Sequence, residues 1–298
     1  MIELAANSYG KSAIRLVKLT RLADRHVLRD LTVGIALEGD FEAAYVEGDN
    51  ANVVATDTMK NTVYAFARDR LDGPIERFGL ALARHFVEFA QVEQATVRIR
   101  EHGWAPVPTA GGPAPDAFLR TGDLTRVAVV TVSRADVTIE AGIEDLTVMK
   151  TTRSGFTGFP RDRYTTLPEV EDRLMATRLA AIWRYARHAD AGGTSAEDGG
   201  AGLDFDAEFG GVRDVLLEVL ASHDSPSVQS SIWQIGRAIL AARPAVDEIR
   251  MTLPNLHHWL VDLSPVTDPA LIPNAAAAAM AVREVDGRVS VKPAVPLH

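Results

Sequence analysis

The sequence of 298 residues contains no cysteine. Disulfide bonds, zinc–thiolate sites, iron–sulfur clusters and thiol nucleophiles are therefore excluded. It also has no apolar run of about 20 residues, the length that a membrane-spanning helix needs. The segment 1–10 has no basic stretch followed by an apolar one, so no secretory signal is indicated and we expect a cytoplasmic protein.

Basic residues and clustered histidines are also scarce. Lys and Arg number 31 against 40 Asp and Glu, which gives a formal net charge of -9. Nucleic-acid-binding surfaces need clustered Lys and Arg, so we expect no nucleic-acid partner. The one histidine pair, His257-His258, points to opposite faces if it lies on a strand, so the two cannot easily share an ion. We therefore expect no metal site.

Periodic apolar residues organise the first half of the chain. Alternation with period two predicts strands, and spacing of three to four predicts helices. The predicted strands are 14–19, 26–37, 95–104 and 125–133, and the predicted helices are 57–69 and 75–89. The Pro- and Gly-rich tract 105–115 is predicted to be a surface loop. The order of this half is therefore ββααββ.

The second half repeats that order. Its predicted strands are 146–152, 177–185, 246–253 and 257–263, and its predicted helices are 205–221 and 228–242. A tract at 189–202, rich in Gly, Ser, Ala and acidic residues, is predicted to be a flexible insertion. The expected units are thus 9–135 and 136–298, and the second ends in a divergent C-terminal tail.

The tandem repeat predicts an α+β fold that resembles the T-fold. In that fold each ββααββ unit forms an antiparallel sheet with paired helices on one face. Sheets that are open at both edges are templates for aggregation unless they pair. The resemblance implies pairing between subunits, which closes a β-barrel tunnel, and we expect a homotetramer with D2 symmetry.

Two short motifs in the first half carry candidate functional residues. Tyr9-Gly10-Lys11 precedes a predicted strand, where a lone Lys is usually a solvated charge but, if desolvated, can act as a base because burial lowers its pKa. Thr56-Asp57 begins a predicted helix. Read structurally, Thr56 is the N-cap and Asp57 complements the helix dipole; the free N–H groups there also suit an anion.

Three further motifs lie in the second half. Their candidate residues are Phe156, Arg173, Val228, Gln229, Asn255 and His257. Taken alone, Phe156 is a loop anchor and Ser227-Val228-Gln229 is a polar first turn of a helix. A guanidinium such as that of Arg173 can instead bind two neighbouring acceptors at once, which a Lys cannot do.

Together, and in this order, the five motifs resemble the urate oxidase family over most of 9–263. The resemblance implies oxidation of urate by oxygen and water to 5-hydroxyisourate and hydrogen peroxide. It implies no metal or flavin cofactor, because the urate dianion can itself reduce oxygen. Lys11 and Thr56 would form the dyad that relays the proton, and His257 would tune it.

The resemblance also implies how urate is held. The residues it assigns to substrate binding are Thr56, Asp57, Phe156, Arg173, Val228, Gln229 and Asn255. Phe156 would stack on the purine, while Arg173 and Gln229 grip opposite edges of the ring. Asn255 would lie above the ring, where oxygen or water binds. The first-half residues Lys11, Thr56 and Asp57 would come from one subunit, and the second-half residues from its neighbour.

The chain departs from the family pattern in three places. Leu256 stands where the family usually has Lys, the segment 111–119 lacks the family's His-rich approach, and 275–279 is a run of alanines. Two alternatives to a urate oxidase stay open. One is another T-fold enzyme acting on a pterin or a different purine, which converging histidines and zinc would favour. The other is a non-catalytic purine-binding protein, which would bind urate without forming peroxide.

Overall fold

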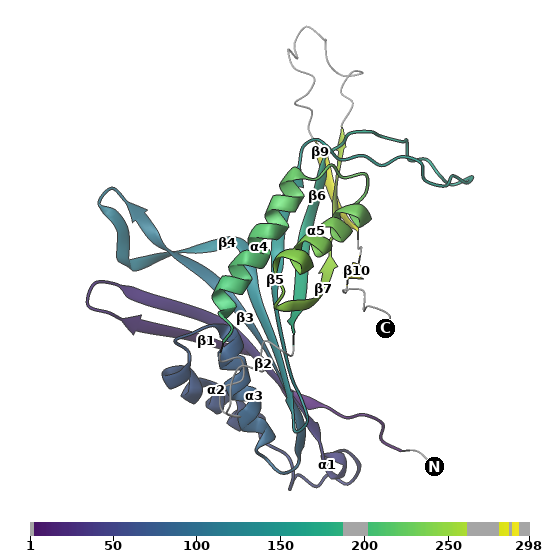
Figure 1. The fold of residues 1–298 in the computed structure, drawn as a ribbon. Coiled ribbons are helices and arrows are strands. Elements are labelled where there is room, and N and C mark those ends of the chain that lie inside the picture. The colour runs from purple at the N-terminus through teal and green to yellow at the C-terminus, as the bar shows by residue number, and fades with distance from the viewer. Residues whose placement is uncertain (1–2, 187–201, 261–279, 286–287, 292–298) are drawn as a thin grey trace.

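A computed structural model describes residues 3–186, 202–260, 280–285 and 288–291 (Figure 1). The predicted insertion at 189–202, apart from its last residue, and the alanine run at 275–279 lie outside these ranges. The first half comprises β1 (Tyr9–Arg21), β2 (His26–Gly39), α1 (Glu42–Val46), α2 (Thr56–Arg70), α3 (Ile75–Val87), β3 (Val92–Thr109) and β4 (Gly112–Ser133). The second half comprises β5 (Val137–Lys150), β6 (Met175–Tyr185), α4 (Phe205–Ser222), α5 (Val228–Ala242), β7 (Val246–Thr252), β8 (Asn255–Leu260), β9 (Met280–Val285) and β10 (Arg288–Val291).

The strands form one antiparallel sheet. Its order is β1-β2-β3-β4-β5-β6-β7-β10, with β8 beside β6 and β9 beside β8. The expected boundary between the units, at 135–136, falls in the turn between β4 and β5. Because β4 and β5 pair along eight residues, from Thr125 opposite Glu144 to Val132 opposite Val137, the sheets of the two halves are continuous.

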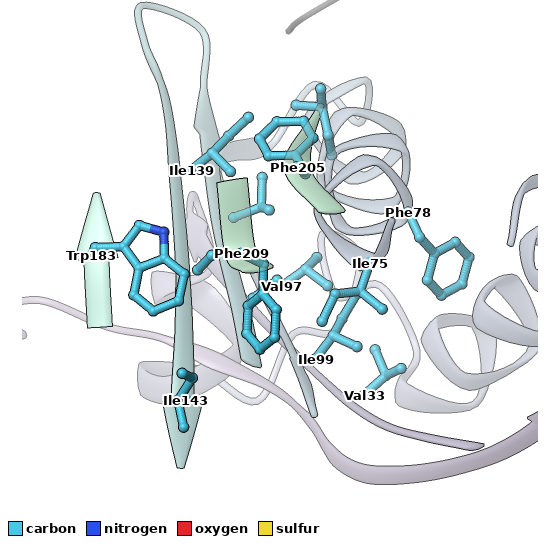
Figure 2. Close-up of a cluster of buried hydrophobic side chains, with 14 of the residues drawn as sticks. Val33, Ile75, Phe78, Val97, Ile99, Ile139, Ile143, Trp183, Phe205 and Phe209 are labelled. Carbon is cyan, nitrogen blue, oxygen red and sulfur yellow. The ribbon is translucent and has the colours of Figure 1, made fainter. Parts of the chain in front are cut away.

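The core lies between this sheet and helices on one of its faces. In Figure 1, α2 and α3 cover the strands of the first half, and α4 and α5 cover those of the second. Figure 2 shows side chains of both halves meeting there, with Ile99 and Ile75 from the first and Trp183 and Phe209 from the second. Burial of such side chains is the main stabilising term in folding, so the two halves share one core.

The four predicted helices are confirmed. In α3 the residues spaced three to four apart, Ile75, Phe78, Leu82 and Phe86, are all fully buried, as an amphipathic helix requires. The short helix α1 was not predicted. It holds no buried residue, so it leaves no apolar periodicity in the sequence.

The predicted surface loop at 105–115 is wrong. Strands β3 and β4 continue through this tract as one long hairpin, pairing Ala105 with Leu119 and Thr109 with Gly112. In Figure 1 the hairpin projects clear of the helices. Prolines argue against a strand in the sequence, but they are tolerated at bulges, and the register shifts between Pro106 and Pro108.

The predicted ending of the second unit also needs correction. The strands at 246–253 and 257–263 were expected to close it as successive strands, but β7 and β8 both pair with β6, one after the other along it. Pro254 separates them, because proline has no N–H to continue a ladder. The strands that close the unit, β9 and β10, come from the divergent tail.

Candidate active site

Lys11 owes its direction to a bulge in β1. Between Lys11 and Ile14 the register with β2 shifts, and Ala13 in between has a left-handed φ of 55°. Directly opposed residues of an antiparallel pair share a face. Lys11 lies opposite Ile35, whose side chain is buried in the core on the helix-bearing face. Lys11 and Ile14 are three residues apart, so in a regular strand they would point to opposite faces, and the bulge lets both point to the helix-bearing face.

Tyr9 connects the start of β1 to the residues just before α2. Its hydroxyl accepts a hydrogen bond from Val54 N at 2.7 Å and donates one to Val54 O at 3.1 Å, while its ring meets Phe41 edge-on at 4.7 Å. The next residue, Gly10, passes so close to β2 that a Cβ there would lie 1.9 Å from the carbonyl oxygen of Ile35. The Tyr-Gly-Lys motif is thus partly a packing requirement.

Thr56 is the first helical residue of α2, and Ala55 is its N-cap, with no side-chain capping bond. The prediction that Thr56 is the N-cap is therefore wrong, because Thr56 already has helical backbone geometry. Its exposed side chain is not used for capping.

Asp57 lies in the first turn of α2, as predicted from the helix dipole. It forms an ion pair with Lys60 and accepts a 2.9 Å hydrogen bond from Asn61. Chiefly Lys60, and to a smaller extent Asn61 and the charge of Lys11, hold the pKa of Asp57 below its usual value. Lys11 and the start of α2 are therefore neighbours, and we call Lys11, Thr56 and Asp57 the relay group.

The segment 151–174, between β5 and β6, folds back on itself. Phe156 N donates to Val170 O at 2.7 Å, and Val170 N donates to Phe156 O at 3.1 Å. Arg173 N donates to Ser154 O at 2.7 Å. This short ladder, the neck of the segment, brings Phe156 and Arg173 together although they are far apart in sequence.

The guanidinium of Arg173 lies over the ring of Phe156, with Cζ 5.3 Å from the ring centroid. On its own segment Phe156 is stacked with Phe159 at 4.8 Å. The Arg173 Nε is buried and has no hydrogen-bond partner among the described residues, and burial lowers the pKa of the group. A half-buried cationic fork with an unused donor, beside an aromatic plane, suits a planar anionic ligand.

The N-terminus of α5 packs against the neck. Gly155 N donates to Ser225 O at 2.8 Å, and Ser225 N donates to Arg153 O at 2.9 Å. Ser227 caps α5 by accepting from Ser230 N, so the first-turn N–H groups of Val228 and Gln229 have no partner within the helix. A pocket of about 510 Å³ opens beside the neck, lined by Arg153, Gly155, Phe156, Thr157, Glu171, Asp224, Ser225 and Pro226.

Asn255 and His257 lie next to the same region because β8 pairs with the start of β6. Thr177 is opposite Asn255, and β6 begins only two residues after Arg173. The Asn255 amide lies 3.4 Å from the His257 ring nitrogens. Side chains two apart on a strand share a face, so Leu256, the departure from the family pattern, points away from both.

The structure thus places six of the predicted residues in one region: Phe156, Arg173, Val228, Gln229, Asn255 and His257. We call them the purine pocket after the role that the sequence analysis expects of them. The structure does not bring the relay group to them. Lys11 is on β1, five strand spacings from β6, roughly 24 Å along the sheet. The paired residues that lead across the sheet from Lys11 end at Tyr185, near the C-terminal end of β6. Arg173, by contrast, lies just before the N-terminal end of β6.

Two observations concern what the described ranges lack. No group of three or more His, Cys, Asp or Glu side chains there is placed to hold a metal ion. Within the same ranges, no helix combines the length and apolarity needed to cross a membrane.

Comparison with known proteins identifies the family. The sequence model of the Uricase family matches residues 7–131 and 139–282. The chain belongs to the uricase family. A uricase of Arthrobacter globiformis is 45% identical over 265 residues, covering 89% of this chain and 82% of the relative. A uricase of Emericella nidulans is 35% identical, covering 89% of this chain and 88% of the relative.

A solved uricase structure has the same fold as this uricase-family chain. The crystal structure of uricase from Arthrobacter globiformis superposes with a TM-score of 0.86 at 41% identity, covering 100% of this chain and 98% of that one. The expected α+β architecture of two tandem T-fold units is thereby confirmed.

The sequence reasoning missed the side chains that hold the purine pocket from outside. Lys150, only 8% exposed, donates to the carbonyl oxygen of His223, and Arg153 binds the last carbonyls of α4. Asp172 bonds across the neck. Only Asp172 left a signal, because it stands directly before Arg173 in the same motif.

Proposed function

We propose that this uricase-family chain is a urate oxidase that converts urate, oxygen and water to 5-hydroxyisourate and hydrogen peroxide. The observation that carries the proposal is the placement of the half-buried Arg173 guanidinium over Phe156, beside the N-terminus of α5. Urate is a planar anion with donors and acceptors along its edges. An aromatic face, a cationic fork and free helix N–H groups match these three properties.

In this proposal the purine pocket binds and orients urate. Phe156 stacks on the ring, and Arg173 donates to two acceptors on one edge. Gln229 presents a donor and an acceptor to the opposite edge, and the N–H of Val228 adds one bond. Fixing a planar substrate in this way removes most of its freedom before any chemistry occurs.

Within the relay group, Lys11 and Thr56 move the proton. Lys11 and Thr56 take the second proton of urate through the Thr hydroxyl, and His257 orients the dyad. Asp57 contacts urate at the start of α2. Asn255 positions oxygen, and afterwards water, above the ring. Urate supplies both electrons that reduce oxygen to peroxide, and water supplies the oxygen atom that is added to the purine, so no cofactor is needed.

We further propose that each active site forms between two subunits. Within one chain, the strand order and register separate the two groups: the relay group is at β1, and the purine pocket is near the start of β6, five strand spacings away. A second copy that pairs with the open edge strand β1 can supply the missing half, and pairing of all edges closes a barrel. A homotetramer with a β-barrel tunnel follows.

Aerobic addition of urate to chelator-treated protein tests the proposed reaction. We expect urate to disappear and peroxide to form in equal amounts. Urate binding without peroxide would identify a non-catalytic purine-binding protein instead. Activity that chelation abolishes and zinc restores would identify a metal-dependent T-fold enzyme.

Mixing two impaired variants tests the shared site, with turnover measured at a urate concentration too low to fill the Arg173→Ala pocket. Chains with Lys11→Met lack a working relay, and chains with Arg173→Ala bind urate weakly. After joint refolding, about a quarter of the sites should combine the intact halves and recover turnover, if subunits assemble at random. No recovery from mixed chains that form tetramers would show that both halves act within one chain.

A further inference from the structure

Asp172 is exposed, yet it is bonded to residues far away in the sequence. Its carboxylate accepts from Thr152 Oγ1 at 2.6 Å and from Ser154 N at 3.2 Å, across 20 and 18 residues. The next residue, Arg173, donates its own N–H to Ser154 O at 2.7 Å. These bonds close a small ring that joins the two ends of the segment 151–174.

We propose that Asp172 is a positioning residue that clasps the neck and thereby fixes the Arg173 guanidinium over Phe156. This inference rests on the proposed function, since it concerns how urate is gripped. Asp172 itself does not touch the substrate. It acts through Arg173, its neighbour in the chain, and through Ser154, two residues before Phe156.

The physical reason lies in the length of the segment and the small number of bonds that hold its neck together. A loop of more than 20 residues gains conformational entropy when its ends separate. Backbone bonds of the neck hold its ends together, and bonds of this kind each contribute only about 1 kcal/mol. A carboxylate that accepts from a hydroxyl and an N–H adds charge-assisted bonds, which are stronger. The bonds of Asp172 therefore favour the conformation in which the two ends of the segment 151–174 stay together.

The carboxylate of Asp172 stays charged at neutral pH. The Thr152 hydroxyl, the Ser154 N–H and further backbone N–H groups hold the pKa of Asp172 below its usual value. The carboxylate form, which accepts these bonds best, is thus the one present in working conditions.

The same segment contains a matched control, Asp162. Its carboxylate accepts from one backbone N–H, that of Tyr164 at 2.9 Å, and from one Thr hydroxyl, that of Thr165 at 2.9 Å. It is exposed, and its pKa is lowered by the same kinds of bond. Its partners are only two and three residues away, so it closes a local turn and leaves the neck untouched.

The test compares Asp172→Ala, Asp172→Asn and Asp162→Ala in the full-length protein. Anaerobic urate titration gives the Kd, aerobic assays give kcat and KM, and hydrogen exchange without urate reports on the neck peptides. For Asp172→Ala we expect Kd and KM to rise about tenfold or more, with kcat within about threefold, because the proton relay is elsewhere. Exchange at Phe156, Val170 and Arg173 should accelerate about tenfold.

The other two variants complete the test. Asp172→Asn keeps an acceptor and should lie between wild type and Asp172→Ala, whereas Asp162→Ala should match wild type in Kd and at the neck. Equal effects of Asp172→Ala and Asp162→Ala, or a loss of kcat without a change in Kd, would overturn the inference. If Asp172→Ala does not fold, Thr152→Val removes one clasp bond and should raise Kd several-fold; no change would count equally against it. Because neck exchange is measured without urate, its outcome is separate from that of the proposed reaction.

Discussion

The relay group and the purine pocket are supported in different ways. Lys11 and Thr56 stand on a strand and at a helix start, positions that the sheet and the core fix through Tyr9 and the bulge at Ala13. The purine pocket depends instead on a long irregular segment whose neck is held by side-chain bonds. In one half regular structure orients the functional groups, and in the other half a network of hydrogen bonds does so.

This difference fits the two tasks proposed for them. A proton relay needs a few groups at fixed separation, which rigid elements provide. A pocket for a ring-shaped ligand needs contacts on a face and on two edges, and strands of one sheet cannot surround a ring. The relay variants should therefore alter turnover, and the pocket variants should alter affinity.

The largest separation of these effects is expected for the dyad. Lys11→Met and Thr56→Ala should each lower kcat about 100- to 10,000-fold, the usual range for loss of a general acid or base. The Kd for urate, measured without oxygen, should change by less than about fivefold. A parallel rise in Kd in both variants would assign these residues to binding and remove the distinction between the halves.

The next largest effect is expected on stability, at the ion pairs of Arg126 that join the two halves of the chain. Arg126 on β4 donates to the buried Glu76 of α3 at 2.9 Å and pairs with Asp206 of α4, while its guanidinium lies 4.6 Å from the Phe209 ring. Arg126→Met leaves the carboxylate of Glu76 buried without its cation. We expect the free energy of unfolding to fall by about 3–5 kcal/mol.

Urea denaturation measures the loss at Arg126, and the double variant Glu76→Gln with Arg126→Met is the control. Removing both charges should restore most of the stability, because the cost arises from the unpaired carboxylate. A loss below about 1 kcal/mol in the single variant would mean that the pair does not hold α3, β4 and α4 together.

Arg173→Ala should impair the purine pocket and therefore lower the affinity for urate. Removing the charged fork should raise the Kd for urate about 10- to 100-fold, since bonds to charged groups are worth about 1.5–3 kcal/mol. At saturating urate, kcat should stay within about tenfold of wild type. Arg173→Lys keeps the charge but not the fork, and should recover only part of the affinity. Full recovery would show that charge alone is recognised.

A smaller loss is expected at the aromatic face. Phe156→Leu keeps an apolar side chain but removes the π-face, which contributes about 0.5–1.5 kcal/mol beyond burial. The Kd for urate should therefore rise about 3- to 10-fold, as measured by anaerobic titration. Phe159→Leu is the control, because Phe159 stacks on Phe156 and was not assigned to urate. A larger effect at Phe159 would exchange the two roles.

The smallest effect is expected at Asp57. Its carboxylate is exposed, and because its pKa is held low it stays ionised as pH falls from about 8 to about 5. Asp57→Asn should change kcat by less than about threefold and leave the acid side of the pH–rate profile in place. Disappearance of the acid limb in this variant would make Asp57 the titrating group.

Much of this architecture could be predicted because it follows from local patterns. The spacing of Ile75, Phe78 and Leu82 gave α3, and apolar alternation gave the central strands. The order of the motifs led to the family. What failed depends on pairing partners: the strands at 105–115 exist because each half of the hairpin supplies the other's hydrogen bonds, which no window of sequence records.

Candidate site residues could be named from the sequence, but the contacts that hold them in place could not be predicted. The clasp of Asp172 spans 18 to 20 residues, and the bonds of Tyr9 to Val54 span 45. Such contacts have no period in the sequence. The same holds for the capping of α2, where the Ala55 backbone takes the position that residue preferences assign to Thr56.

The bulge at Ala13 lets an odd spacing place the base and the core residues of β1 on one face. Lys11 and Ile14 are three residues apart, a separation at which the side chains of a regular strand point to opposite faces. Flattening the bulge without changing the length of the chain would therefore send the ammonium group to the far side of the sheet, away from Thr56. Deleting one residue between Lys11 and Ile14 would instead leave an even spacing, and Lys11 would stay opposite Ile35 on a strand without a bulge. Insertions and deletions are usually judged by the stability they cost, but here their sign also matters, because the left-handed Ala13 already accommodates one extra residue.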